Sequence, residues 1–317
     1  MVDVFSLVFP IFGLIALGYG LLASKLLPEG SGTILSKFTF MVPIPLLIFR
    51  ALASNDPADQ APWLIWISYF FCVAVIWLAA MLALRWGFSR KGPALVIAGV
   101  SAAFSNTVLF GIPVVSGAFG DEGLVPVLIL LSIHLPVMML VTSAMVEGFA
   151  AKENGGGLGQ LDWWGMIKRV FFSLGKNPII YGILAGGIWG VFGWPIPYLA
   201  GLVIDRVVPV ALPLALISMG MGLRHYGLRG NIAPGFVLAL LKVLAFPALC
   251  YWVTFFVLPM DPLWAAAIVL VSACPTGVNA YLLAEQFEVG HGIAANSITL
   301  SVLMAFVAFP FWLVVVS

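Results

Sequence analysis

Long apolar segments follow one another along the whole chain, separated by short polar stretches. A helix needs about 20 apolar residues to cross the hydrocarbon core of a bilayer. Counted at that length, the pattern predicts ten membrane-spanning helices, at residues 4–23, 34–53, 63–86, 94–117, 123–146, 178–194, 198–223, 232–258, 262–286 and 290–316. The sixth is the shortest, and its boundary with the seventh is the least clearly marked. We therefore expect an all-α integral membrane protein.

Two of these segments carry polar residues and helix breakers near their middle. SNTVLFGIP (Ser105 to Pro113) interrupts the fourth segment, and SACPTGVNAY (Ser272 to Tyr281) interrupts the ninth. Backbone groups freed by a break are costly in hydrocarbon, so such breaks persist only inside protein or beside a water-filled cavity. Interrupted helices at matching places in two halves of a chain are typical of the substrate site of a secondary transporter.

The two halves of the chain resemble each other. The second segment of each half carries two prolines, which are Pro43, Pro45, Pro209 and Pro213. With five segments in each half, the second half enters the membrane from the opposite side, which predicts two inverted five-helix repeats. We expect the first repeat at residues 1–146, a linker at 147–177 and the second repeat at 178–317.

Composition and charge support this picture and orient it. Only 9% of the residues are charged and mean hydropathy is +1.14, whereas soluble domains are about 25% charged. The net charge of +1 gives no reason to expect a nucleic-acid partner. Eleven Lys and Arg residues fall in one set of alternate loops and two, Arg50 and Arg206, in the other. By the positive-inside rule both termini face outside and the 147–177 loop is cytoplasmic.

That loop begins with a Gly-rich stretch, Asn154 to Gly159, and continues with an amphipathic pattern. Its apolar positions recur at helical spacing beside two cations: Trp164, Ile167, Lys168, Arg169, Phe171 and Leu174. The pattern predicts a helix lying on the inner leaflet. A plain linker is favoured over a regulatory role.

The two interruptions and the prolines lie near one depth in the membrane, which predicts two unwound segments crossing at the centre between kinked helices. The N-termini of half-helices at such a crossing expose N–H groups with partial positive charge, which suits an anion. Asn106, Thr107, Thr276 and Asn279 could add side-chain hydrogen bonds. The alternative is that these are ordinary kinks and polar groups packed between helices.

Two ionisable side chains are expected within the membrane, at Lys242 and His134. No Asp or Glu is expected at that depth, since Asp205 lies further out with Arg206 beside it as a local partner. Lys242 then loses its proton, bonds carbonyls freed by the breaks, binds a substrate carboxylate, or extends along its stem to the inner interface. His134 is either a satisfied interior histidine or a contact for protons or substrate.

Several motifs resemble one family of transporters. NTVLFGIPVVSGAFG (from Asn106) and ACPTGVNAYLLAEQFEV (from Ala273) are similar to the fourth- and ninth-span signatures of the auxin efflux carrier family. PLALISMGMGL and KVLAFPALC also agree, and the resemblance covers essentially the whole chain. That family includes plant PIN proteins and bacterial carriers often called malonate permeases. The long hydrophilic loop of the plant members is absent, so their regulation by kinases is not carried over.

The resemblance implies ten helices in inverted repeats, a scaffold with a mobile transport domain, elevator-type alternating access and a homodimer in a bacterial inner membrane. Asn106 matches the family's substrate-contacting asparagine. With the analysis above, the candidate substrate-binding residues are Asn106, Thr107, Pro113, His134, Lys242, Pro275, Thr276 and Asn279. The candidate hinge and crossover residues are Pro43, Pro45, Gly111, Pro113, Pro209, Pro213, Pro275 and Gly277.

The function expected is secondary-active transport of small organic anions, with auxin-like or malonate-like carboxylates as the substrate class. No cofactor or metal is expected, and proton coupling is one option. The chain lacks the sequence motifs of an intramembrane enzyme, and a channel would favour repeated charge or carbonyl rings along a pore. A sodium-coupled symporter of the bile-acid type is the closest alternative, although no carboxylate lies at the expected crossing.

Overall fold

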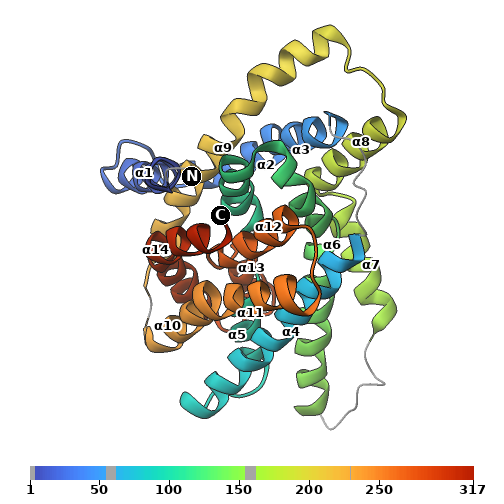
Figure 1. Cartoon of the computed structure of the whole chain (residues 1–317). Helices are drawn as coiled ribbons and strands as arrows, with labels where there is room; N and C mark the ends of the chain where they lie inside the picture. The colour runs from blue at the N-terminus through green and yellow to red at the C-terminus, as the bar shows by residue number, and fades with distance from the viewer. Residues whose placement is uncertain (1–3, 55–61, 154–161, 229) are drawn as a thin grey trace.

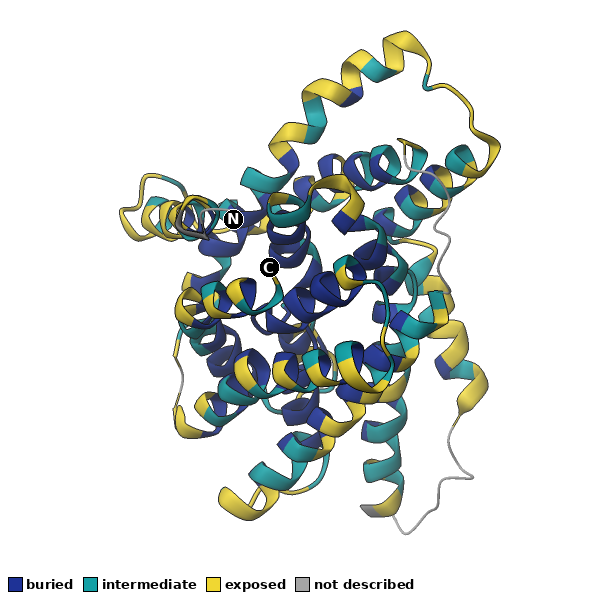
Figure 2. Cartoon of the chain, viewed as in Figure 1, coloured by how far each residue is buried: buried dark blue, intermediate teal, exposed yellow. Residues whose placement is uncertain are grey.

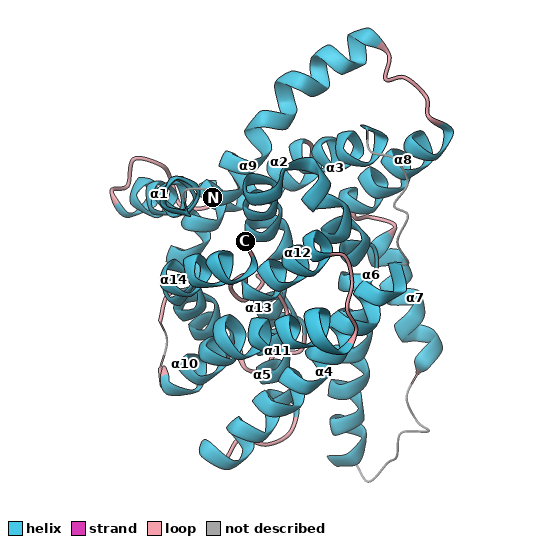
Figure 3. Cartoon of the chain, viewed as in Figure 1, coloured by secondary structure: helices cyan, strands magenta, loops and turns pink. Residues whose placement is uncertain are grey.

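The computed structural model describes residues 4–54, 62–153, 162–228 and 230–317. These residues are almost entirely helical with short connecting loops, and the only β-structure among them is one isolated bridge (Figure 3). The first half contains α1 (Val4–Ala23), α2 (Ser31–Met41), α3 (Pro43–Ser54), α4 (Pro62–Gly87), α5 (Pro93–Ala103), the π-helical turn η1 (Thr107–Gly111) and α6 (Ile112–Glu153).

The second half begins after α7 (Trp163–Leu174), which occupies the expected amphipathic segment. It contains α8 (Pro178–Phe192), α9 (Tyr198–Tyr226), α10 (Ala233–Leu240), η3 (Leu241–Ala245), α11 (Phe246–Trp252), η4 (Val253–Val257), α12 (Pro262–Ala273), α13 (Asn279–Gln286) and α14 (His291–Val316). The Gly-rich stretch from Asn154 to Gly159 lies outside the described residues.

Among the described residues, seven helical segments are long and apolar enough to cross a membrane. They are Ser6–Ala23, Ser31–Ser54, Pro62–Gly87, Thr107–Lys152, Tyr198–Tyr226, Ala233–Val257 and His291–Val316. Three further apolar helices, α5, α8 and α12, are shorter. The protein is thus an all-helical membrane protein, while the count of ten crossings stays a prediction.

Local chemistry explains where the long segments bend. Val42 ends α2 with φ −126° and ψ −71° because the following Pro43 disfavours helical geometry in the residue before it. Gly120, inside α6, has φ +65°, a conformation that glycine adopts readily. The Thr107–Lys152 segment therefore turns at Gly120, between the expected fourth and fifth crossings.

The helices fall into two groups. In Figure 1, α2, α3, α8 and α9 lie together at the top of the view, and α4, α5 and α10 to α13 lie below them. Within the first group α3 packs along α8, and α1 joins this group by packing along α9. Figure 2 shows buried residues concentrated in the centre and exposed ones on the outer helices. The exposed apolar side chains of α8 and α9, such as Phe192 and Leu199, suit a lipid environment.

Glycines allow the close packing in the first group. A Cβ on Gly18 would lie 2.0 Å from the Ile217 carbonyl oxygen, and a Cβ on Gly220 would lie 1.9 Å from that of Ile15. The backbones of α1 and α9 thus touch directly, as small residues permit between membrane helices.

One expected ion pair is wrong. Asp205 of α9 pairs with Arg50 of α3 rather than depending on its neighbour Arg206. The two residues are far apart in sequence, and packing between α3 and α9 brings them together. Both side chains are exposed, so the pair links two helices at the surface without a buried charge.

Candidate functional site

The two interrupted segments lie side by side and bond to each other. Ser105 and Thr276 form the antiparallel β-bridge. The N–H of Asn106 donates to the Pro275 carbonyl at 2.9 Å, and the N–H of Gly277 donates to the Phe104 carbonyl at 2.8 Å. Backbone groups freed by the end of one helix are therefore satisfied by those freed at the other, without lipid or water.

The bridge leaves no room for a side chain at Gly277. A Cβ there would lie 2.9 Å from the Phe104 ring and 3.0 Å from the Ser105 carbonyl oxygen. Gly111 is also close-packed, since its Cβ would lie 3.3 Å from the Cys274 sulfur. These two glycines permit the approach of the broken segments.

A buried polar network supports one side of the bridge. Thr276 Oγ1 donates to the Ser101 carbonyl at 2.7 Å and lies 3.1 Å from Ser297 Oγ. The Thr276 N–H donates to Ser301 Oγ at 2.9 Å. Thr276 thus joins α5 and α14 at the bridge, and it does not line the cavity described below.

The side chain of Lys242 reaches the end of α12, the helix that stops at the second break. It lies in η3 and is fully buried, which excludes the expected alternative of a side chain extending to the interface. Its Nζ donates to the Ser272 carbonyl and lies 4.7 Å from the centre of the Phe246 ring. Ser272 is in the last turn of α12, where carbonyls lack amide partners and carry partial negative charge. Lys242 therefore supplies a hydrogen-bond donor to the end of α12.

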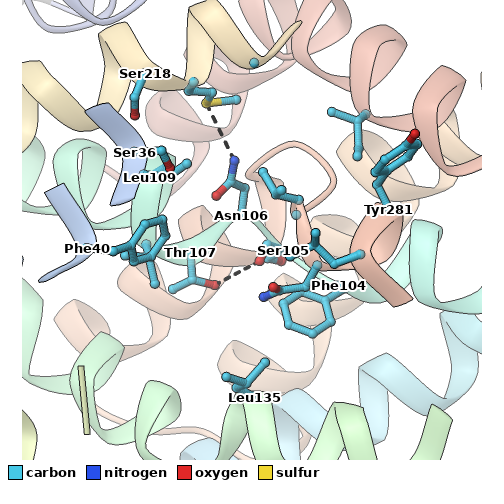
Figure 4. Close-up of a pocket in the computed structure, with 18 of the residues that line it drawn as sticks. Ser36, Phe40, Phe104, Ser105, Asn106, Thr107, Leu109, Leu135, Ser218 and Tyr281 are labelled. Carbon is cyan, nitrogen blue, oxygen red and sulfur yellow. Dashed lines mark hydrogen bonds between the residues drawn. The ribbon is translucent and has the colours of Figure 1, made fainter. Parts of the chain in front are cut away.

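A cavity of about 480 Å³ adjoins the bridge. Asn106 and Thr107 line it beside the crossing, and Ser36 and Ser218 line it as well. Figure 4 shows the Thr107 hydroxyl directed back to the Ser105 carbonyl, to which it donates at 3.4 Å. Of the candidate substrate-binding residues, Asn106, Thr107, His134 and Asn279 line the cavity. The others are placed elsewhere: Pro113, Lys242, Pro275 and Thr276.

The hinge candidates are more dispersed. Gly277 lines the cavity. Pro43 begins α3, Pro45 packs its carbonyl against Gly182 of α8, and Pro113 lies in the first turn of α6. Pro209 and Pro213 lie inside the uninterrupted helix α9.

The end of the cavity that adjoins the bridge is rich in hydrogen-bond donors. Helical structure begins beside it twice, at Thr107 in η1 and at Asn279 in α13. In α13 the N–H groups of Ala280 and Tyr281 already donate to the Gly277 and Val278 carbonyls, so this end contributes mainly the positive end of the helix dipole. Asn106 Nδ2 makes only a weak contact with Met219 Sδ at 3.6 Å. Among the described lining residues the only carboxylate is Glu285.

His134 forms part of the same wall. Its ring centre lies 4.7 Å from that of Phe104 and 5.3 Å from that of Tyr69. Its Nε2 is buried and has no hydrogen-bond partner within the described part of the chain. The surrounding wall is apolar, including Phe40, Leu131 and Leu135.

The cavity extends from the bridge toward one end of the helices. Its far end is lined by Lys37 of α2, Asn177 before α8, and His225 and Tyr226 at the end of α9. These residues adjoin the loops that carry most of the Lys and Arg residues. The far end is therefore on the Lys/Arg-rich side of the molecule.

Sequence reasoning missed several lining residues because only packing brings them together. Tyr226 of α9 and Tyr281 of α13 lie edge to face at 5.1 Å, and His225 lies 6.2 Å from Tyr281. Tyr281 lies within the quoted ninth-segment motif, but no local signal marks Tyr226 as its neighbour or Lys37 as a lining residue of the same cavity. The described residues contain no group of three or more His, Cys, Asp or Glu side chains suited to a metal ion.

Comparison with known proteins identifies a family of membrane transporters. A family model described as "Membrane transport protein" matches residues 3–157 and 162–313. An uncharacterized transporter of Methanothermobacter thermautotrophicus is 28% identical over 95% of each chain. A putative malonate transporter of Rhizobium meliloti is 24% identical over 96% of this chain and 93% of its own.

A plant protein is similar as well. Auxin efflux carrier component 8 of Arabidopsis thaliana is 24% identical over 86% of this chain and 85% of its own. The family match covers nearly the whole chain and includes both interrupted segments. The chain therefore belongs to the membrane transport protein family, to which its resemblance to the auxin efflux carriers had pointed.

Proposed function

We propose that this protein is a secondary-active transporter that binds small organic anions at the crossing of its two broken segments. The observation that carries the proposal is the cavity of about 480 Å³ beside the Ser105–Thr276 bridge. Two helical segments begin at the end of the cavity beside the bridge, so the positive ends of their dipoles favour a bound anion there.

The chemistry of the wall favours a carboxylate. Asn106 and Asn279 offer amide donors, while the only carboxylate among the described lining residues, Glu285, belongs to the end of α13 away from the bridge. Apolar residues such as Phe40, Leu131 and Leu135 suit the body of an organic molecule. Two relatives are named as a putative malonate transporter and an auxin efflux carrier component, and these names support a carboxylate substrate.

The packing supports the inverted repeat. In the repeat, α1 of the first half corresponds to α8 of the second half, and α3 corresponds to α9. The contact between α1 and α9 then corresponds to the contact between α8 and α3. Both pairs pack extensively, and in both a glycine faces a backbone carbonyl. We therefore propose ten crossings in two five-helix repeats, at residues 1–146 and 178–317, with residues 147–177 as a cytoplasmic linker.

The two walls of the cavity support an elevator mechanism. One wall comes from α2, α8 and α9, and the other from η1, α6 and α13. Movement of the second group against the first would carry the bridge and its substrate across the membrane. The open end on the Lys/Arg-rich side is then the inward-facing state, with both termini outside and a homodimer in the inner membrane of a bacterium.

The position of Lys242 favours this carrier over a sodium-coupled symporter. Its ammonium group binds a carbonyl at the broken end of α12, a position where a cation would otherwise be needed. We propose that Lys242 replaces a coupling cation, so that transport does not require sodium. Transport is then either coupled to protons or a uniport of the anion alone.

Uptake into proteoliposomes tests the proposed function. A panel of small carboxylates that includes malonate and indole-3-acetate would be offered to the wild type and to Asn106→Ala. We expect uptake of at least one carboxylate, and weaker binding in the variant by about 1–3 kcal/mol because a buried partner loses its hydrogen bond. Asn231→Ala, outside the cavity, is the control. Uptake that both variants leave unchanged would contradict a site at Asn106.

A further inference from the structure

A second cavity, of about 560 Å³, lies between the turn that joins α4 to α5 and the end of α6. Four cationic side chains line it: Arg85, Arg90, Lys91 and Lys152. The remaining lining residues are Trp86, Ser89, Gly92, Leu95 and Phe149. We call this cavity the basic pocket.

The charges of the basic pocket converge from two separate parts of the chain. Arg85 ends α4 and Lys91 precedes α5, whereas Lys152 belongs to the end of α6. Among the described residues no ion pair involves any of the four cations, and none of the described lining residues is acidic. A general excess of positive charge on the cytoplasmic side would not by itself bring these four cations around one cavity.

A helix N-terminus adds to this charge. α5 begins at Pro93, directly after the lining residue Gly92, and no side chain caps its first amides. Pro93 has no N–H and the Leu95 N–H donates to the Gly92 carbonyl, so the contribution of this end is mainly the positive end of the helix dipole, which favours a phosphate. The basic pocket thus combines side-chain cations with a helix N-terminus.

The apolar part of the lining indicates where the phosphate comes from. Trp86 is 74% exposed and stands with Phe149 beside the cations. Tryptophan at the end of a membrane helix is typical of the level of the lipid headgroups. A soluble phosphate would leave these rings uncovered, whereas a phospholipid offers its glycerol and acyl chains to them.

We propose that the basic pocket binds the phosphate group of an anionic phospholipid in the leaflet on the Lys/Arg-rich side. This inference does not depend on the transported substrate. α5 runs directly from the basic pocket to Phe104 at the crossing, so the lipid holds the far end of the helix that leads into the bridge.

Titration of the purified full chain with fluorescent phosphatidylglycerol tests the proposal. Arg90→Gln with Lys152→Gln removes one cation from each side of the basic pocket. Since each cation near a lipid headgroup contributes substantially, we expect the apparent Kd to rise by about tenfold or more. Lys25→Gln with Arg224→Gln removes the same charge from exposed positions on the same side of the molecule but outside the basic pocket, and should change the Kd by less than about twofold.

Competition distinguishes the source of the phosphate. Unlabelled phosphatidylglycerol should displace the probe, while phosphatidylcholine and millimolar inorganic phosphate should not. Displacement by inorganic phosphate at concentrations that match the lipid would instead identify a soluble phosphate and overturn the lipid assignment. Equal loss of binding in the Lys25 and Arg224 control would reduce the effect to general surface charge and overturn the basic pocket.

A second pair of substitutions guards against misfolding. Arg85→Gln with Lys91→Gln affects different residues of the basic pocket, and all four cations are exposed, so a folded protein with an unchanged Tm is expected. The same rise in Kd supports the proposal. Unchanged binding in either folded pair would overturn it.

Discussion

At the crossing, the two broken segments pack tightly against each other at a residue without a side chain, Gly277. A methyl group there would meet the Phe104 ring at 2.9 Å and a backbone oxygen at 3.0 Å. Because one of these neighbours is backbone that already bonds across the crossing, it has little freedom to move.

Gly277→Ala should therefore destabilise the fold by about 1–3 kcal/mol and abolish anion uptake. Gly187→Ala in α8 is the matched control, since a Cβ there meets nothing within 4 Å. Thermal unfolding and uptake of both variants would be compared with the wild type. A Gly277 variant as stable and as active as the control would mean that the bridge is not needed.

Lys242 allows the roles of charge and packing to be separated. Lys242→Met keeps much of the buried stem but removes the bond to the Ser272 carbonyl, so a stability loss of about 1–3 kcal/mol is expected. If the lysine replaces a coupling cation, this variant should also bind the anion poorly, and wild-type uptake should be unchanged when potassium replaces sodium. Lower stability with normal anion affinity would limit Lys242 to a structural role.

At the scale of helices, the contact between α1 and α9 depends on Gly18. A Cβ at this position would lie only 2.0 Å from the Ile217 carbonyl oxygen. Gly18→Val should separate the two helices and reduce the Tm and the yield of folded protein. Gly20→Val, on the same helix, is the control because nothing lies within 4 Å of its Cβ position. Equal effects of the two substitutions would show that the effect of a β-branched side chain on the helix itself, and not the packing of α1 against α9, causes the loss of stability.

The helices differ in how far the sequence predicts them. The breaks in the fourth and ninth segments are predictable because proline, glycine and small polar residues act locally on the backbone. The pairing of Ser105 with Thr276, and the contact of Lys242 with Ser272, join distant segments and leave no local pattern. The pair formed by Arg50 and Asp205 was missed for the same reason, since a sequence neighbour offered a simpler partner.

For the candidate site, sequence reasoning identified Asn106, Thr107, His134 and Asn279, all of which line the cavity. It also selected Thr276, whose hydroxyl is instead bonded to the Ser101 carbonyl and Ser297. A polar residue beside a break can face a cavity or a neighbouring helix, and only the packing of α5 and α14 decides between these.

For the whole molecule, the main feature is a cavity between two groups of helices that reaches the crossing from the Lys/Arg-rich side. Its walls belong to different groups, and Tyr226 meets Tyr281 across the division. An arrangement of this kind suits a carrier that exposes one site alternately to each side, which is the central claim of the proposed function.

Accessibility of a single cysteine at Val278, which lines the cavity, tests that claim most directly. The three native cysteines are buried and would be replaced, and Ser317→Cys would mark the side of the C-terminus. A membrane-impermeant thiol reagent should react at position 278 from the Lys/Arg-rich side and more slowly from the side of Ser317, and the transported anion should slow both reactions. Reaction only from the side of Ser317, or rates that the anion leaves unchanged, would contradict an alternating site at the crossing.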